Sequence, residues 1–289
     1  MKTFLELIKF SHTIFALPFA LVATFWASAY LGQLWPGWAR LGLILVCMVC
    51  ARTFAMTFNR LVDRAFDAKN PRTAKRPSVT GEVSVGTMRL IIIACVIGFM
   101  AACAGFYFLA HNIWPLVLGL PVLAWLGIYS LTKRFTPLCH FWLGISLGLA
   151  PVSAMIAIAG GINAAVLLLG LAVTFWVAGF DILYALQDEE FDRANGLKSM
   201  PVALGRTSAL WLSRVCHVLA IAALLNAGLV GQFGLLYWLG VIIAAALLIV
   251  EQSLVSPRDI SKINIAFMTV NGIVGLVFGS LAILDVLIR

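Results

Sequence analysis

Apolar runs of about twenty residues recur along most of this chain, and they constrain its fold more than any other feature. Hydrophobic residues make up 62% of the 289 positions and charged residues 11%, and the mean hydropathy is +1.03. A soluble domain of this length does not reach such values. Because about twenty apolar residues in a helix cross the hydrocarbon core of a bilayer, the sequence predicts an all-α, polytopic membrane protein.

We expect nine transmembrane helices, arranged as one bundle that forms a single integral-membrane domain over residues 1–289. The apolar runs place these helices at about 13–32, 41–62, 89–109, 113–131, 138–159, 163–185, 208–230, 235–254 and 263–287. Two polar connectors, at about 64–88 and 186–207, are long enough to form a cap over the membrane. They follow the second and sixth runs, so the cap is expected on one side.

Basic residues mark that side as cytoplasmic. All of the 20 Lys and Arg residues except Arg40 and Arg289 fall at the N-terminus or in and beside the even-numbered connectors. By the positive-inside rule, the N-terminus and both long connectors face the cytoplasm. The net charge of +8 therefore reflects membrane topology, and no nucleic-acid partner is expected.

Aspartates cluster at the ends of two apolar runs. The first group has spacing i, i+4, i+8 and the second has steps of 3, 4 and 4; they are Asn59, Asp63 and Asp67, and then Asp181, Tyr184, Asp188 and Asp192. On a continuous helix each group would share one face. A charged group at membrane depth costs at least ~2.5 kcal/mol, so such acids are candidates for function.

Divalent metal binding is the chemistry that these two groups predict. Magnesium prefers oxygen ligands and is usually held by one or two carboxylates together with substrate phosphates. The expected Mg²⁺ ligands are Asn59, Asp63, Asp67, Asp188 and Asp192. The alternative is that the acids only form ion pairs with nearby arginines at the membrane surface. Two such groups on different runs favour the metal site.

Basic and aromatic residues near the same ends are candidates for substrate binding. Lys133 follows the fourth run, with Tyr129 one turn earlier. Arg52 lies two turns deeper than Asn59 and has the forked geometry that binds a carboxylate. Three residues of the cap connectors, Lys75, Arg76 and Lys198, could bind phosphate oxygens or could be solvated surface residues.

The remaining polar residues form no pattern that indicates a function. His111, His140 and His217 do not form a metal-binding pattern. Glu251 and Asp285 lie near the ends of their runs, where we expect them at the membrane interface.

The ordered motifs resemble those of the UbiA superfamily of intramembrane prenyltransferases, whose motifs are N-D-x-x-D-x-x-x-D, Y-x-x-x-K and D-x-x-Y-x-x-x-D-x-x-x-D. The sequence supplies them as Asn59, Asp63 and Asp67, then Tyr129 and Lys133, then Asp181, Tyr184, Asp188 and Asp192. Arg60 departs from the pattern, because the family has aspartate there. It projects about 100° from Asn59, so we expect it to pair with a loop acid or with lipid headgroups.

The resemblance implies a nine-span enzyme that transfers a polyprenyl group from its diphosphate to an acceptor, with Mg²⁺ as cofactor. Implied catalytic residues are Asp63, Asp67, Asp181, Asp188, Asp192 and Lys133, and implied substrate-binding residues are Arg52, Asn59, Tyr129, Tyr184, Lys75, Arg76 and Lys198. The motif sequences look like the 4-hydroxybenzoate polyprenyltransferase branch, which serves respiratory quinone synthesis in the bacterial cytoplasmic (inner) membrane. A dihydroxynaphthoate acceptor, for menaquinone, is an alternative. A cation-coupled transporter is the competing class.

Overall fold

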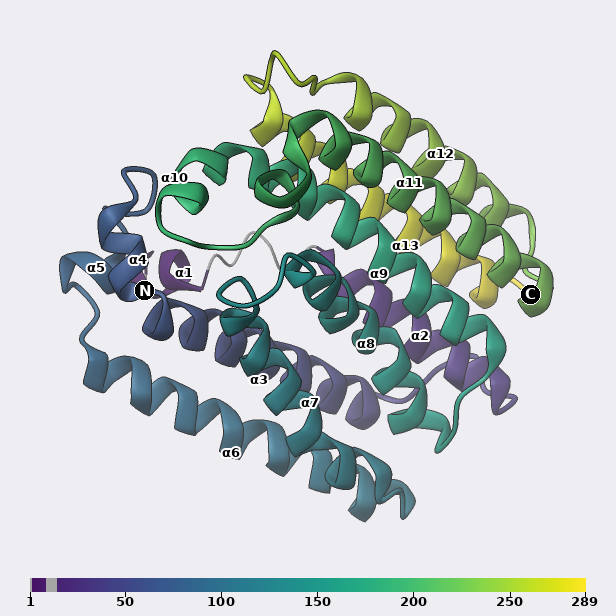
Figure 1. The fold of residues 1–289 in the computed structure, drawn as a ribbon. Coiled ribbons are helices and arrows are strands. Elements are labelled where there is room, and N and C mark those ends of the chain that lie inside the picture. Colours follow the sequence, from purple (N-terminus) through teal and green to yellow (C-terminus); the bar gives the residue numbers. More distant parts are fainter. Residues whose placement is uncertain (1, 9–14) are drawn as a thin grey trace. The chain divides into compact units, whose positions relative to one another are not determined.

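The computed structural model describes residues 2–8 and 15–289 (Figure 1). Every regular element within these residues is a helix, as the composition predicts. The helices form two compact units. Unit 1 comprises Met1–Thr13 and Trp38–Leu131, and unit 2 comprises Ile14–Gly37 and Thr132–Arg289.

Eight of the described segments are long and apolar enough to cross a membrane. They contain α3 (Trp38–Val62), α6 (Val85–Ala110), α7 (Trp114–Thr132), α8 (Cys139–Ala159), α9 (Ala164–Ala185), α11 (Met200–Gly231), α12 (Leu235–Ser253) and α13 (Asn271–Leu287). The first expected span differs. Its described part is α2 (Leu17–Tyr30), an apolar helix of 14 residues, and its expected start, residues 13 and 14, lies outside the described residues. The count of nine spans and the single domain remain predictions.

Unit 1 is built on the pairing of α3 with α6, which run alongside each other in Figure 1. Phe54 of α3, Phe99 of α6 and Leu123 of α7 belong to one buried apolar cluster. Gly105 allows close approach, because a Cβ there would overlap Leu43 of α3. These contacts hold α3 against α6 and α7. The acidic residues at the C-terminal end of α3 therefore belong to a helix with a fixed position within unit 1.

The connector after α3 folds into the short helices α4 (Arg64–Lys69) and α5 (Pro77–Thr80). The last helix of unit 1 is the N-terminal α1 (Lys2–Leu7), which packs on α3 and α5. The connector is tied back on itself because Arg64 Nε donates to the carbonyl of Ser78 at 2.9 Å.

Unit 2 is built around α9, which lies between α8 and α11 (Figure 1). Small residues permit the close packing of α8 on α9. A Cβ at Gly144 would overlap the carbonyl oxygen of Thr174, and a Cβ at Gly148 would overlap that of Gly170. Small residues at helix interfaces are the usual route to close approach in membranes. Beyond α9, a single 3₁₀ turn (Leu186–Asp188) leads into α10 (Glu189–Ala194).

Two acids expected at the membrane interface are buried among the helices of unit 2, and their depth in the membrane stays a prediction. Asp285 is 1% exposed and accepts from the backbone N–H groups of Gly234 and Tyr237, which caps the start of α12. Glu251 is 0% exposed and accepts from Asn271 Nδ2 at 2.7 Å. Asn271 follows the π-helical segment Ile265–Val270. Buried carboxylates require such partners, and the sequence does not reveal them.

Candidate active site

The first acidic motif is held together partly as its spacing predicts. Asn59 Nδ2 donates to Asp63 Oδ2 at 2.8 Å, an i,i+4 contact on the last turns of α3. The helix does not continue smoothly to Asp67, however. Asp63 has φ −94° and ψ 3°, and it separates α3 from α4. The backbone N–H groups of Asp63 and Asp67 still donate to the carbonyls of Asn59 and Asp63 at 2.9 and 2.8 Å, so the shared face of the three residues stays a prediction.

Arg60 lies inside this motif rather than at the membrane surface. It is 5% exposed, and its Nη1 is 3.5 Å from Asn59 Oδ1 and 3.9 Å from Asp67 Oδ2. Arg76 holds the other oxygen of Asp67 at 2.7 Å. The expected pairing of Arg60 with an acid of the connector is confirmed, because Asp67 lies in the connector after α3, although this acid belongs to the motif itself. Arg60 and Asp67 are seven residues apart, so they lie on nearly the same helix face two turns from each other, and the long side chain of Arg60 spans that distance.

The second motif has a similar backbone conformation at its equivalent residue. Asp188 has φ −103° and ψ 2°, and it separates the 3₁₀ turn from α10. Asp63 and Asp188 thus both occupy the sparsely allowed bridge region, where active-site residues are often found. In each motif the next aspartate, four residues later, is buried and paired with a cation.

In unit 2 that pair is Lys133 and Asp192, with Nζ 2.6 Å from Oδ2. Asp192 is 1% exposed and Asp188 8% exposed. Burial alone would lower the pKa of Lys133, but the charge of Asp192 and its hydrogen bond, with a contribution from Asp188, raise the pKa above its usual value. Lys133 therefore stays protonated at neutral pH and faces two aspartates of the motif.

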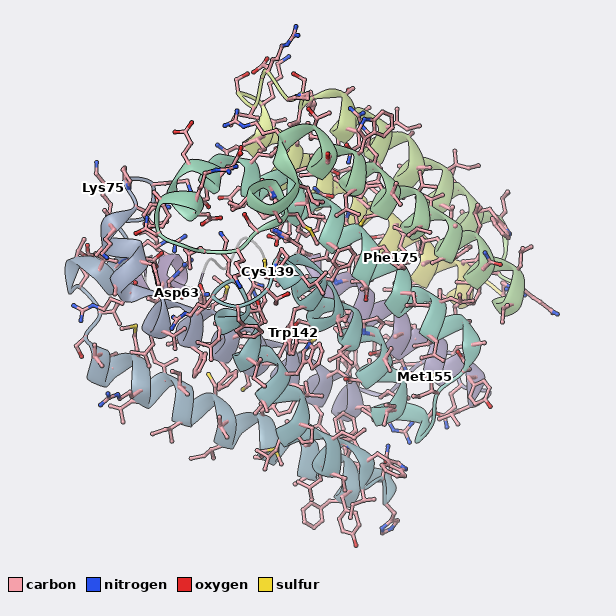
Figure 2. The ribbon with its side chains drawn as sticks, in the orientation of Figure 1. Asp63, Lys75, Cys139, Trp142, Met155 and Phe175 are labelled. Carbon is pink, nitrogen blue, oxygen red and sulfur yellow. The ribbon has the colours of Figure 1, made fainter. Side chains whose placement is uncertain are left out.

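The remaining aspartate of the motif has a different partner, which the sequence did not indicate. Asp181 Oδ2 lies 2.7 Å from Nδ1 of His140, the second residue of α8. The labelled Cys139 in Figure 2 marks this end of the helix. His140 Nε2 accepts from the backbone N–H of Met200 at 3.2 Å. No local spacing could reveal this contact, because 41 residues separate the two side chains.

The segment around Lys198 is docked against the start of α8. The backbone N–H of Lys198 donates to the carbonyl of Lys133 at 2.7 Å, and its Nζ lies 3.2 Å from the carbonyl of Phe135. The ammonium group is exposed. This predicted phosphate-binding residue therefore lies beside the backbone of Lys133, within the same unit.

The other predicted substrate-binding residues are distributed over both units. Tyr184 is half-buried and stacks on Phe267, with ring centroids 4.1 Å apart. Arg52 and Tyr129 are half-buried on α3 and α7. Lys75 is exposed, and Figure 2 shows it on the outer side of the connector, pointing away from Asp63.

Comparisons with known proteins agree with the motifs. Residues 20–273 match the model of the UbiA prenyltransferase family. The chain belongs to this family. It is 30% identical over 237 residues to the 4-hydroxybenzoate octaprenyltransferase of Aromatoleum aromaticum, covering 81% of this chain and 78% of that protein. The enzyme of the same name from Nitrosomonas europaea is 28% identical over 247 residues, covering 86% and 82%.

Solved UbiA structures share the fold. The apo UbiA homologue of Aeropyrum pernix K1 has a TM-score of 0.84 and 32% identity, covering 95% of this chain and 98% of that one. The homologue of Archaeoglobus fulgidus bound to DMAPP and Mg²⁺ has a TM-score of 0.72 and 22% identity, with 99% of each chain covered. The chain is therefore a membrane-embedded prenyltransferase of the UbiA family, which confirms the resemblance and the enzyme class and removes the transporter alternative.

Charge balance distinguishes the two motifs of this UbiA family member. In unit 1, Asp63 and Asp67 are matched by two guanidinium groups, those of Arg60 and Arg76. In unit 2, three aspartates lie with one cation, Lys133, because His140 accepts from a backbone N–H and is neutral. The formal charge is therefore zero in the first motif and −2 in the second.

Proposed function

We propose that this UbiA family member transfers a polyprenyl group from polyprenyl diphosphate to the ring of an aromatic acid, with 4-hydroxybenzoate as the expected acceptor, in respiratory quinone biosynthesis. The observation that supports it most directly is the cluster of two buried aspartates, Asp188 and Asp192, with the partly exposed Lys133. It joins carboxylates suited to a divalent cation and an ammonium suited to a phosphate. Relatives named 4-hydroxybenzoate octaprenyltransferase support the acceptor.

The second motif fits Mg²⁺ as cofactor. Asp188 and Asp192 offer hard oxygen ligands, and the formal charge of −2 in this motif matches a divalent ion. The first motif fits less well, because Arg76 binds one oxygen of Asp67 at 2.7 Å and the positive charge of Arg60 lies 3.9 Å from the other. We therefore propose Asp188 and Asp192 as the principal ligands, with Asn59, Asp63 and Asp67 as further predicted ligands. When bound, the ion neutralises negative charge that builds on the leaving diphosphate.

The residues of the chain then have separate tasks. Lys133 keeps its proton and binds a phosphate oxygen, which stabilises the leaving group as the allylic C–O bond breaks. Lys198 lies beside the backbone of Lys133 and is proposed to bind an outer phosphate oxygen. Lys75 and Arg76 of the first connector stay predicted phosphate-binding residues. The apolar spans exclude water, which protects the allylic cation from hydrolysis. The faces of Tyr129 and Tyr184 stabilise that cation.

The aromatic acceptor is bound through its carboxylate by Arg52. The guanidinium lies two turns deeper on α3 than Asn59 and forms a planar fork that suits a carboxylate. Arg52→Lys keeps the charge and loses the fork. The variant should raise the apparent KM for 4-hydroxybenzoate by about tenfold or more, with little change in the KM for the prenyl diphosphate. A selective defect for the diphosphate would place Arg52 at the leaving group instead.

We propose that the protein lies in the bacterial cytoplasmic membrane with its N-terminus in the cytoplasm. The test uses a cysteine-free variant with a single cysteine at Thr80 or at Gln33, both of which are exposed. An impermeant thiol reagent added to intact cells should label the Gln33 variant and not the Thr80 variant. The opposite pattern would invert the topology.

The acceptor is tested with purified protein in detergent, geranyl diphosphate, Mg²⁺ and a panel of aromatic acids. Prenylated 4-hydroxybenzoate is the expected product. Prenylation of a dihydroxynaphthoate alone would assign the enzyme to menaquinone biosynthesis and contradict the expected acceptor.

A further inference from the structure

We propose that His140 is a positioning residue, which fixes the orientation of the Asp181 carboxylate and leaves its negative charge intact. The role of Asp181 in the reaction rests on the function proposed above. The arrangement of the two side chains does not, since both belong to unit 2 and their contact is a feature of the fold.

The hydrogen bonds of His140 determine its tautomer. A backbone N–H only donates, so the contact from Met200 at 3.2 Å requires a lone pair on Nε2. The ring proton then lies on Nδ1 and is donated to Asp181 Oδ2 at 2.7 Å. The imidazole is neutral, and it is 2% exposed. In a histidine, the partner of one ring nitrogen sets the role of the other.

Close helix packing holds this pair in place. Gly144 and Gly148 lie one and two turns after His140 on α8, and a Cβ at either position would overlap a backbone carbonyl of α9. Asp181 is on α9, two turns beyond Thr174, whose carbonyl faces Gly144. The two backbones therefore have no room for a larger residue at this contact, and His140 has little freedom to move away from Asp181.

The neutral donor sets Asp181 apart from the other acids of the motif. Asp192 is paired with Lys133, a full positive charge. His140 instead supplies a dipole, which orients a carboxylate without cancelling its charge. Asp181 remains partly open, with 20% of its side chain exposed. Its second oxygen can thus present a full negative charge to a cation during the reaction, so loss of its orientation should slow the chemical step.

Two substitutions separate the two hydrogen bonds. His140→Asn places an amide N–H near the position of Nδ1 and can still donate to Asp181, whereas His140→Gln places a polar atom near the position of Nε2 and can serve only Met200. We expect His140→Gln to lower kcat by about 10–100-fold, a typical loss when a partner of a site residue is removed. His140→Asn should keep kcat within about threefold, and the KM for geranyl diphosphate should change little in both variants.

A double variant tests whether His140 acts through Asp181. In the Asp181→Asn background, the His140→Gln change should add less than about threefold to the loss, because the two changes affect one interaction. Additive losses would contradict the proposal. So would a fully active His140→Gln variant, or a loss in His140→Asn as large as in His140→Gln, since His140 would then serve only to anchor Met200. Thermal unfolding in detergent checks that each variant is folded.

The tautomer is measured without turnover. A ¹⁵N spectrum of histidine-labelled wild-type protein in detergent, with the His140→Asn variant for assignment, should show a protonated Nδ1 and an unprotonated Nε2 for His140. A proton on Nε2 would overturn the proposal. If the wild-type protein transfers geranyl groups to no aromatic acid, the proposed function fails, and this spectrum still decides whether His140 donates to Asp181.

Discussion

Replacement of Lys133 by methionine should destabilise the protein in a way that Mg²⁺ reverses. Methionine keeps the length and apolar stem of the side chain and removes its charge, which leaves the buried Asp192 without its ion-pair partner. At an effective dielectric constant of about 20, unit charges 2.6 Å apart attract by about 6 kcal/mol before desolvation is counted. The net loss is smaller, because both ions lose hydration in the folded state.

The burial of the two side chains sets the size of the expected loss of stability. Removal of one partner from a fully buried pair typically costs ~3–5 kcal/mol. The Lys133 side chain keeps 32% of its surface exposed, and solvent screens its contribution. We therefore expect Lys133→Met to lower the free energy of unfolding by about 2–3 kcal/mol, which corresponds to a fall in Tm of about 5–10 °C.

A thiol-reactive dye provides the assay, because Cys95, Cys103, Cys139 and Cys216 are buried and become reactive on unfolding. Mg²⁺ at about 100 times its dissociation constant should restore about 2.7 kcal/mol to Lys133→Met. The control is the double variant in which Asp192 is also changed to Asn. It should regain most of the lost stability without Mg²⁺ and respond less to the ion.

Either of two results would refute the reasoning about this pair. An unchanged Tm in Lys133→Met would mean that Asp192 does not depend on Lys133. An equal response to Mg²⁺ in the single and double variants would mean that Asp192 is not a ligand.

Three further substitutions test the arrangement of side chains. Arg60→Ala should lower stability by about 1–3 kcal/mol in thermal unfolding, because it removes one of two guanidinium partners from a buried aspartate; no change would show that Arg60 is not part of the motif. Gly144→Ala should reduce kcat and Tm, because the added methyl group forces α8 away from α9. The control is Gly42→Ala, where a Cβ meets nothing within 4 Å, and it should be neutral or stabilising by up to about 1 kcal/mol. Equal effects of the two changes would contradict the close packing of α8 on α9. Asn271→Leu removes the hydrogen bonds that Asn271 makes with Glu251 and with the indole N–H of Trp176, and it should cost about 2–5 kcal/mol in the same assay. Wild-type stability would show that these bonds contribute little.

Helix positions were predictable from the sequence because hydrophobic length sets them directly. The helices α3, α6 and α13 all overlap apolar runs that the pattern of hydropathy along the sequence identifies. The i,i+4 contact of Asn59 with Asp63 was predictable for a similar reason, since it depends only on the geometry of one helix. The pairing of Arg60 with Asp67 was also within reach of the sequence, because residues seven apart lie on nearly one face of a helix.

Contacts that depend on packing between helices were not predictable. The contact of His140 with Asp181 requires two helices to approach at glycine positions, which a motif scan does not weigh. These are tertiary effects, and no pattern within one segment encodes them.

The most direct test of the proposed function is the product formed by the wild-type protein. Purified protein in detergent, incubated with geranyl diphosphate, 4-hydroxybenzoate and Mg²⁺, should release diphosphate and yield a ring-prenylated acid, identified by mass spectrometry and NMR. The product should disappear in chelator and fall by orders of magnitude in Asp188→Asn. Full turnover in chelator, or release of diphosphate with no prenylated aromatic product, would contradict the account.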